Sequence, residues 1–146
     1  MGKSEDGVLG LMRAIDASVR RRQERFLAGN FGLTLPQYQL LLEAVESPET
    51  NLGALAERMG CSRGNLTGIA DRLERGGWIC RDRSTDDRRV VHVHVTEKGQ
   101  RVGAISAAMA EEMQRWIAVP NEETAVLVGL LRRGISHLSQ RLGKPA

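Results

Sequence analysis

Arginine side chains are concentrated in one stretch of this sequence of 146 residues, from Arg58 to Arg89. The stretch contains eight arginines and no lysine, and it has five carboxylates: Asp71, Glu74, Asp82, Asp86 and Asp87. The guanidinium group is a planar set of donors that suits bidentate contacts with phosphates and guanine edges. The formal net charge of the whole chain is +3, which permits a polyanionic partner without requiring one. The arginine-rich stretch therefore favours a nucleic-acid partner.

The two cysteines, Cys61 and Cys80, are too few for a disulfide framework and lack the spacing of a cysteine-based zinc site. Cys61 directly precedes the start of a predicted helix, where the positive end of the helix dipole favours an ionised thiol. Cys61 is therefore a candidate redox residue. Cys80, in a predicted strand, is expected to be a buried packing residue.

His92 and His94 lie two positions apart in a predicted strand, so their side chains share one face. Such a pair can ligate zinc, but no third ligand is evident near it in the sequence. We expect instead a polar row that faces solvent, opposite Val91, Val93 and Val95. The sequence therefore predicts no metal and no cofactor.

Catalytic chemistry and membrane insertion find little support in the sequence. It contains no nucleophile motif, no phosphate-binding loop and no metal-ligand set. No apolar run reaches the roughly 18 residues that a membrane span requires. The N-terminus, MGKSEDGVLG, carries acidic residues where a secretory signal requires a basic stretch. We therefore expect a cytoplasmic protein that is not an enzyme.

The elements that position these groups follow from apolar periodicity and from capping residues. Thr34 and Gln37 form a capping-box pattern, and Asn51 and Ser62 are further expected N-caps. The predicted helices cover residues 8–27, 36–45 and 52–59, a stretch from Ser62 to Gly76, a stretch capped by Thr96 that runs to Trp116, and a last stretch from Asn121.

Two of these helices form a helix-turn-helix pattern, and two β-rich runs follow them as a predicted hairpin. The helix over 52–59 and the helix after Ser62 are short and are separated by a three-residue turn, which is the helix-turn-helix pattern. The runs 78–83 and 90–95 flank the polar sequence STDDRR and predict a hairpin with a charged tip.

The helix after Ser62 has one apolar stripe, formed by Leu66, Ile69, Ala70 and Leu73. At roughly 100° per residue, the positions opposite the stripe are Gly64, Gly68, Asp71, Arg72 and Arg75, flanked by Asn65 and Thr67. Each mid-helix glycine costs about 0.5 to 1 kcal/mol relative to alanine, so two on one face need a reason. We expect them to let the helix backbone approach DNA closely. The side chains that would then reach base edges and phosphates are Arg63, Asn65, Thr67 and Arg72.

With this order of elements, the chain resembles the MarR family of bacterial winged-helix regulators. The resemblance covers residues 33–99 at motif level: L-A-E-R-M before the turn, T-x-x-x-D-R-L-E-R-x-G in the second helix, D-R-R in the wing and V-T-E-K-G after it. It implies a mainly α fold with a small β-hairpin wing. The expected single domain, 1–146, has a winged helix-turn-helix DNA-binding lobe over 34–96 and a helical dimerisation region over 8–28 and 97–142.

The resemblance also implies a homodimer that binds double-stranded DNA sequence-specifically at pseudo-palindromic operators. We expect a repressor whose binding is loosened by a small-molecule effector or an oxidant. Two alternatives remain open: a winged-helix protein-interaction module that does not bind DNA, and a thiol-based redox sensor that uses Cys61. Family members that sense peroxides typically use a cysteine in the first helix, which this chain lacks.

The expected DNA-binding residues are Ser62, Arg63, Asn65, Thr67, Gly68, Arg72, Arg83, Asp87, Arg88 and Arg89. In the wing motif of the family an aspartate steadies an arginine that enters the minor groove. The resemblance thus implies that Asp87 supports the inserted Arg89, while Arg88 contacts phosphate. Many relatives carry a larger polar or basic residue at the position of Gly68, so their base specificity cannot be transferred to this chain.

Overall fold

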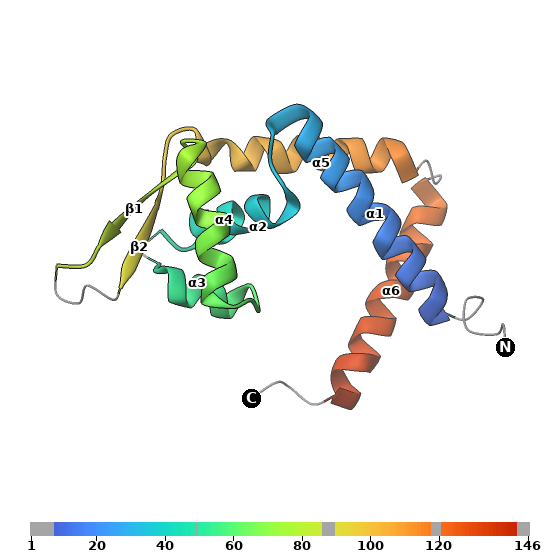
Figure 1. Cartoon of the computed structure of the whole chain (residues 1–146). Helices are drawn as coiled ribbons and strands as arrows, with labels where there is room; N and C mark the ends of the chain where they lie inside the picture. Colours follow the sequence, from blue (N-terminus) through green and yellow to red (C-terminus); the bar gives the residue numbers. More distant parts are fainter. Residues whose placement is uncertain (1–7, 49, 86–89, 118–120, 143–146) are drawn as a thin grey trace, which may run out of the picture. The chain divides into compact units, whose positions relative to one another are not determined.

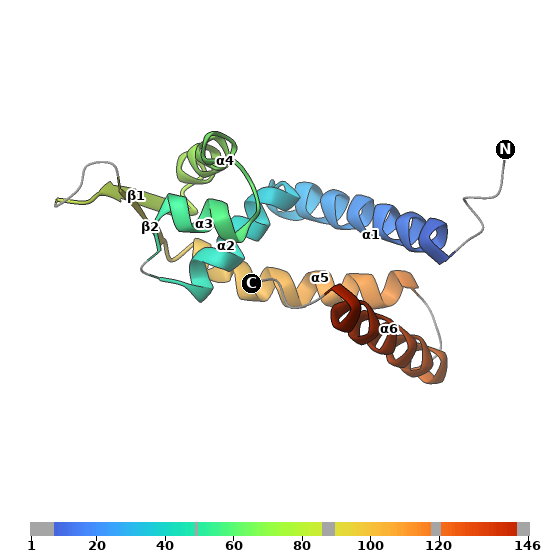
Figure 2. The same cartoon turned by 90° about the horizontal axis from the view of Figure 1, so that it is seen from below.

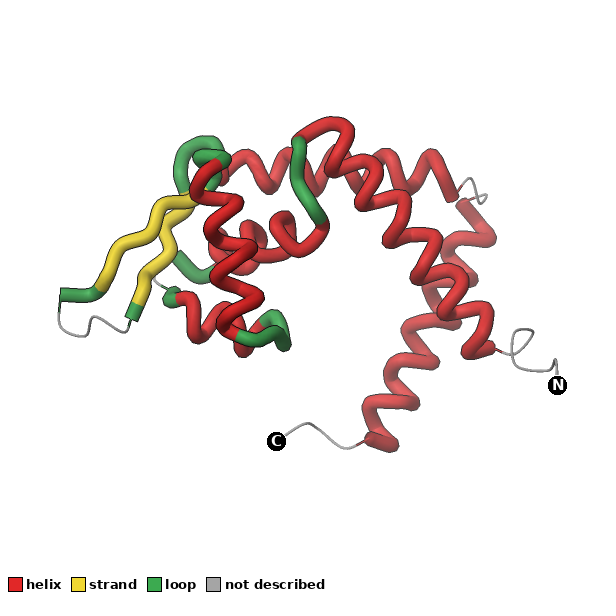
Figure 3. The backbone as a smooth tube through the Cα atoms, viewed as in Figure 1, coloured by secondary structure: helices red, strands yellow, loops and turns green. Residues whose placement is uncertain are grey.

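The computed structural model describes residues 8–48, 50–85, 90–117 and 121–142. The described residues form a mainly helical fold with one antiparallel hairpin, which confirms the expected fold class (Figures 1 and 3). The elements are α1 (Val8–Phe31), α2 (Leu35–Glu46), α3 (Leu52–Arg58), α4 (Arg63–Arg75), β1 (Ile79–Arg83), β2 (Val91–Val95), the 3-10 helix η1 (Gly99–Arg101), α5 (Val102–Ile117) and α6 (Asn121–Leu142).

The three predicted N-caps are confirmed, and each acts within its own first turn. At α2 the Thr34 peptide N–H donates to Oε1 of Gln37 over 2.8 Å, and the Gln37 N–H donates back to the Thr34 hydroxyl. Asn51 Oδ1 accepts from the Ala54 N–H at 2.9 Å. Ser62 caps α4 in the same way. Each cap satisfies backbone donors that a helix leaves unpaired at its start.

The helix predicted to start at Thr96 begins later than expected. The Thr96 hydroxyl donates to the carbonyl oxygens of Gly77 and Trp78, at 2.7 and 3.0 Å, and accepts from the Gly99 N–H. A short turn and η1 therefore precede α5, which starts at Val102. Gly99 is buried there, and a Cβ at this position would clash with the carbonyl oxygen of Trp78. Thr96 thus makes a cap-like contact with the turn before η1 and, in addition, joins this turn to the residues after α4.

One hydrophobic core joins the end of α1 to α2, α3, α4, the hairpin and α5. The predicted apolar stripe of α4 is buried in it as a whole. The buried apolar residues are Leu27, Leu33, Leu35, Tyr38, Leu40, Leu41, Ala44, Leu55, Ala56, Leu66, Ile69, Ala70, Leu73, Trp78, Ile79, Val93, Val102, Ile105 and Met109. This core holds α4 from behind and leaves its opposite side uncovered.

The hairpin register determines which side chains face the core. Arg81 pairs with Val93, and Cys80 pairs with His94. Ile79 and Val93 are buried, whereas Cys80 is exposed, so the expectation of a buried Cys80 was wrong. Successive side chains in a strand point to opposite faces, and the face with Ile79 is the inner one. The hairpin lies with β1 beside α4 and β2 beside α3 (Figures 1 and 2).

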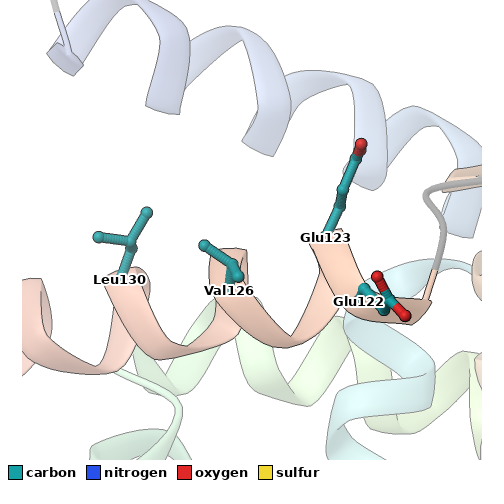
Figure 4. A pocket seen from close by; sticks show the side chains of 4 residues that line it. All are labelled: Glu122, Glu123, Val126 and Leu130. Atoms are coloured by element: carbon teal, nitrogen blue, oxygen red, sulfur yellow. The ribbon is translucent and has the colours of Figure 1, made fainter.

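The chain divides into two compact units, Met1–Met113 and Gln114–Ala146. Within the first unit, Arg22 of α1 forms an ion pair with Glu112 of α5. The second unit contains the end of α5 and α6. Val126 and Leu130 project from the same side of α6 and are exposed (Figure 4). Among the described residues, no helix has the length and apolar character of a membrane span.

Candidate nucleic-acid interface

The outer side of α4 is open to solvent. Arg63, Asn65, Thr67 and Arg72 are exposed, and so is the N-cap Ser62. A Cβ added at Gly64 or Gly68 would meet no heavy atom within 4 Å, so nothing in the described chain fills the space over these glycines. The structure therefore brings together on one helix the predicted helical site residues, with the backbone accessible between them. Their contact with DNA stays a prediction.

Two of these side chains have local contacts that restrict them. The Thr67 hydroxyl donates to the Arg63 carbonyl oxygen over 2.8 Å, which fixes the rotamer of Thr67. The guanidinium of Arg63 lies against the start of α3, where a Cβ added at Gly53 would be 3.5 Å from Nη2 of Arg63. Arg63 therefore spans from α4, which is the second or recognition helix of the helix-turn-helix pattern, to α3.

Asp71 differs from the sequence expectation, which placed it on the outer side of α4. Its side chain is about half exposed and its Oδ1 lies 2.7 Å from Nη2 of Arg81, on β1. Asp71 thus faces the wing. Helical periodicity gave its angular position within about one residue's rotation, but the neighbouring strand determines what the side chain contacts.

Arg81 connects α4 to β1 through two carboxylates. Its Nη2 lies 2.6 Å from Glu74 Oε2 and its Nε 3.1 Å from the same oxygen, while its peptide N–H donates to Glu74 Oε1 over 3.0 Å. These hydrogen bonds lower the pKa of the Glu74 carboxyl below its ordinary value of 4.5. The same contacts raise the pKa of Arg81. The guanidinium of Arg81 and the carboxylate of Glu74 are therefore ionised at neutral pH.

The ion pairs divide the arginines of the 58–83 stretch into two groups. Arg58 pairs with Glu43 at 2.7 Å and Arg81 pairs with both carboxylates of α4, while Asp82 lies 3.0 Å from His94 Nε2. The arginines that form no salt bridge with another described residue are Arg63, Arg72, Arg75 and Arg83. Arg81 engages both carboxylates of α4, so Arg63, Arg72 and Arg75 keep their positive charge without a described carboxylate partner on this helix.

The predicted wing residues Asp87, Arg88 and Arg89 lie outside the described residues, and their roles stay predictions. Arg83 is described and is exposed. By the alternation of β1 it shares a face with Ile79 and Arg81, which is the face that contacts α4. Arg83 therefore lies on the side of the wing that faces the recognition helix.

The candidate redox residue Cys61 and the candidate metal ligands His92 and His94 differ in burial. Cys61 is half-buried and packs against the core at the turn before α4. Its redox role stays a prediction. His94 is exposed and His92 half-buried, on the face opposite the buried Val93, as the alternation predicted. The described residues contain no cluster of three His, Cys, Asp or Glu side chains arranged to hold a metal ion.

Sequence reasoning missed Arg81 and Lys98. Lys98 donates to the Gly76 carbonyl oxygen over 2.7 Å and lies 4.5 Å from the ring centroid of Trp78, so it completes the end of α4. A signal for Arg81 was present, because Asp71 and Glu74 are three residues apart and therefore share a helix face. Nothing local indicated which arginine would meet them.

Known proteins resemble this chain in sequence and in fold. The model of the MarR family matches residues 33–91. The transcriptional repressor MprA of Escherichia coli strain K12 is 32% identical over 126 residues, which cover 84% of this chain and 70% of the relative. The structure of Streptococcus pneumoniae FabT in complex with DNA has a TM-score of 0.72 and 26% identity over 92% of this chain and 94% of that chain. A MarR family protein from Bacillus stearothermophilus has a TM-score of 0.73 and 26% identity over 90% and 93%.

Proposed function

The chain belongs to the MarR family of transcriptional regulators, and from this premise we propose that it binds pseudo-palindromic operators in duplex DNA as a homodimer and represses transcription. The observation that carries the proposal is the group of arginines on α4 and β1 that form no salt bridge with another described residue, namely Arg63, Arg72, Arg75 and Arg83. Arginines that are not neutralised within the protein are the groups that release counterions from DNA phosphates on binding.

In the proposed complex, α4 enters the major groove with its open side. Gly64 and Gly68 let the helix backbone approach the bases, since no side chain projects there. Arg72 and Asn65 are long enough to reach base edges, and bidentate contacts of Arg with guanine and of Asn with adenine are the common forms of direct readout. Arg83, on the wing strand β1, contacts the DNA phosphate backbone beside the major groove.

The helical regions outside the lobe support the homodimer. Leu11 and Ile15 of α1, and Val126 and Leu130 of α6, are exposed in the single chain. Large apolar side chains in a row on a helix are usually covered by another surface. We place the dimerisation region at 8–28 and 97–142 and the DNA-binding lobe at 34–96. A two-fold dimer reads half-sites about one helical turn apart, roughly 34 to 36 Å.

We also propose that the protein acts in the cytoplasm, where a bacterial regulator has access to chromosomal DNA, and that it has no catalytic activity. Release of DNA by a small-molecule effector, which the family resemblance implies, stays a prediction. The described part of the chain offers no residue set that identifies the effector.

Fluorescence anisotropy against a library of genomic fragments, at two salt concentrations, tests the function. Binding that neutralises Z phosphates weakens with salt at a logarithmic slope of about −0.9Z. Arg72→Gln should weaken binding by about tenfold, which corresponds to about 1.4 kcal/mol. Arg58→Gln is the matched control, because it removes the same charge from an arginine that Glu43 already neutralises. The absence of binding to any fragment at low salt would instead support a protein-interaction module.

A further inference from the structure

We propose that Arg81 is a positioning residue that fixes the wing against the recognition helix, so that the DNA-binding groups of β1 and α4 have a set spacing. The inference rests on the proposed function and goes beyond it, because Arg81 is bound to carboxylates of α4 and is not one of the proposed DNA contacts. Its contacts with Asp71 and Glu74 join two elements that otherwise meet through their apolar ends.

The first support is the geometry of the contact. Glu74 accepts from both the side chain and the peptide N–H of Arg81, so it holds the strand backbone as well as the guanidinium. Asp71, one turn earlier on α4, accepts from the same Nη2 as Glu74. An ion pair that includes a backbone donor restrains the position of the strand, which a pair of flexible side-chain tips does not.

The second support is burial. The Arg81 side chain is 19% exposed, whereas the ion-paired side chains of Arg22 and Arg58 are 34% and 42% exposed. Exposed ion pairs contribute little because solvent screens them and because their side chains lose freedom on pairing. The Arg81 guanidinium is thus better shielded from solvent than that of Arg22 or Arg58, while its partners Glu74 and Asp71 are 37% and 48% exposed.

The third support is the place of Arg81 along the hairpin. Ile79 is the last buried apolar residue of β1, and Arg81 is the next residue on the same face. In the described residues, Arg81 is thus the outermost side chain of β1 that is hydrogen-bonded to α4. Arg83 follows two residues later, about 6.6 Å further along the strand. Fixing Arg81 therefore fixes the point from which Arg83 extends.

The hairpin also has a second anchor on its other strand. The Val93 N–H donates to the Thr50 carbonyl oxygen over 3.2 Å, and His92 forms a backbone bridge with Asn51. This anchor holds β2 to the start of α3. Loss of the Arg81 contact should therefore leave a folded hairpin that is still held by Ile79 and by β2, while its outer part can change its angle to α4, because a two-stranded sheet without further support twists readily.

Arg81 also neutralises two carboxylates that lie next to a DNA-binding surface, so the test must separate position from charge. Arg81→Lys keeps the positive charge but loses the planar fork that contacts both Asp71 and Glu74. We expect Arg81→Lys to weaken operator binding by about tenfold while the salt slope stays close to that of the unmodified protein, since the number of charges is unchanged. Thermal unfolding checks that the variant remains folded.

A double-mutant cycle with Arg83→Ala reports the positioning role directly. If Arg81 positions the wing, Arg83→Ala should cost about tenfold in affinity in the unmodified protein and only about twofold in the Arg81→Lys background, where the wing contact is already impaired. Hydroxyl-radical footprinting should show weaker protection beside the major-groove site in Arg81→Lys. Equal affinity and an unchanged footprint for Arg81→Lys would overturn the proposal.

A variant that removes the whole charge cluster guards against failure of Arg81→Lys to fold. In Asp71→Asn/Glu74→Gln/Arg81→Met no charge of the cluster is left without its partner, so folding is expected. Reduced wing protection in this variant supports the proposal, and protection equal to that of the unmodified protein contradicts it. If the unmodified protein binds no operator, the proposed function fails, which is a distinct outcome from binding that is insensitive to Arg81.

Discussion

Helices α4 and α6 both carry an apolar stripe, yet the stripes have opposite surroundings. On α4, Leu66 and Leu73 are 0% exposed, whereas on α6 Val126 is 62% and Leu130 55% exposed. The difference is not one of hydrophobicity, since both stripes contain branched aliphatic residues at helical spacing. It teaches that the DNA-binding lobe covers its own core, whereas the last helix requires a surface that the single chain does not supply.

Helix α1 shows the same contrast within one element. Leu27, near its end, is fully buried in the core of the lobe, whereas Leu11 is 57% exposed in the single chain. The part of α1 that reaches the lobe is thus covered within the chain, and the preceding turns are not. This division supports a second copy as the partner of the exposed turns, since a two-fold axis can cover both copies at once.

The largest expected effect is on the core of the lobe. Leu73→Ala should lower the free energy of unfolding by about 2 to 5 kcal/mol, because it removes buried methyl groups and leaves a cavity. Urea denaturation followed by circular dichroism measures this change. Leu130→Ala, measured at a protein concentration at which the chain is monomeric, should stay within about 0.5 kcal/mol of the unmodified protein. Equal losses in the two variants would remove the contrast between α4 and α6.

The next effect concerns the exposed stripe of α6. Leu130→Asp should weaken dimerisation by about a hundredfold, because it places a charge in the apolar surface between copies. Analytical ultracentrifugation over a range of concentrations measures the dissociation constant. Ser136→Asp is the control, since it adds the same charge at an exposed position of α6 on another side of the helix. A dimer of unchanged affinity in Leu130→Asp would exclude this face as the interface.

A smaller effect is expected on the open side of α4. Gly68→Leu should weaken operator binding by about tenfold or more because it prevents close approach of the helix backbone to the bases. The protein should remain as stable as before, because a Cβ at this position meets no atom within 4 Å and glycine is a poor helix former. Gly103→Leu on α5 is the matched control, with the same open space around it. Undiminished binding by a folded Gly68→Leu would exclude the close approach.

The smallest effect is the pH dependence of the contact between α4 and the wing. The pKa of Glu74 is lowered in the folded state, so its ionised form stabilises the fold above pH 4.5 and this contribution is lost as the pH falls through the lowered value. The free energies of unfolding of the unmodified protein and of Glu74→Gln should differ by less than about 1 kcal/mol at pH 7, since solvent screens a partly exposed ion pair. The difference should vanish in acid. A difference that persists in acid would show that the ion pair is not its source.

Much of the lobe could be predicted from the sequence because its signals are local. Thr34, Asn51 and Ser62 each accept a hydrogen bond from a residue three positions later, and such contacts depend on the neighbouring sequence alone. The apolar spacing of α4 likewise predicted the buried stripe. The arginines that were predicted on the outer side of this helix are exposed for the same reason.

The failures concern residues whose surroundings come from distant parts of the chain. Alternation in β1 predicts two faces but does not say which is the inner one, and Cys80 is exposed because Ile79 packs into the core. Thr96 accepts from the Gly99 N–H as a cap does, but its hydroxyl also donates to Gly77, nineteen positions away, and α5 itself starts only at Val102. Asp71 faces β1 because Arg81 lies opposite it.

The sequence by itself determined the order of elements, the starts of α2, α3 and α4, the buried stripe of α4 and the concentration of arginine around the recognition helix. These features depend on contacts within about four residues and on side-chain periodicity. Only the tertiary structure decided which arginines keep their charge available, since that depends on which carboxylates lie next to them in space. Arg81 meets Asp71 and Glu74, while Arg72 and Arg83 meet no carboxylate among the described residues. The physical reason is that ion pairing is short-range in space but not in sequence.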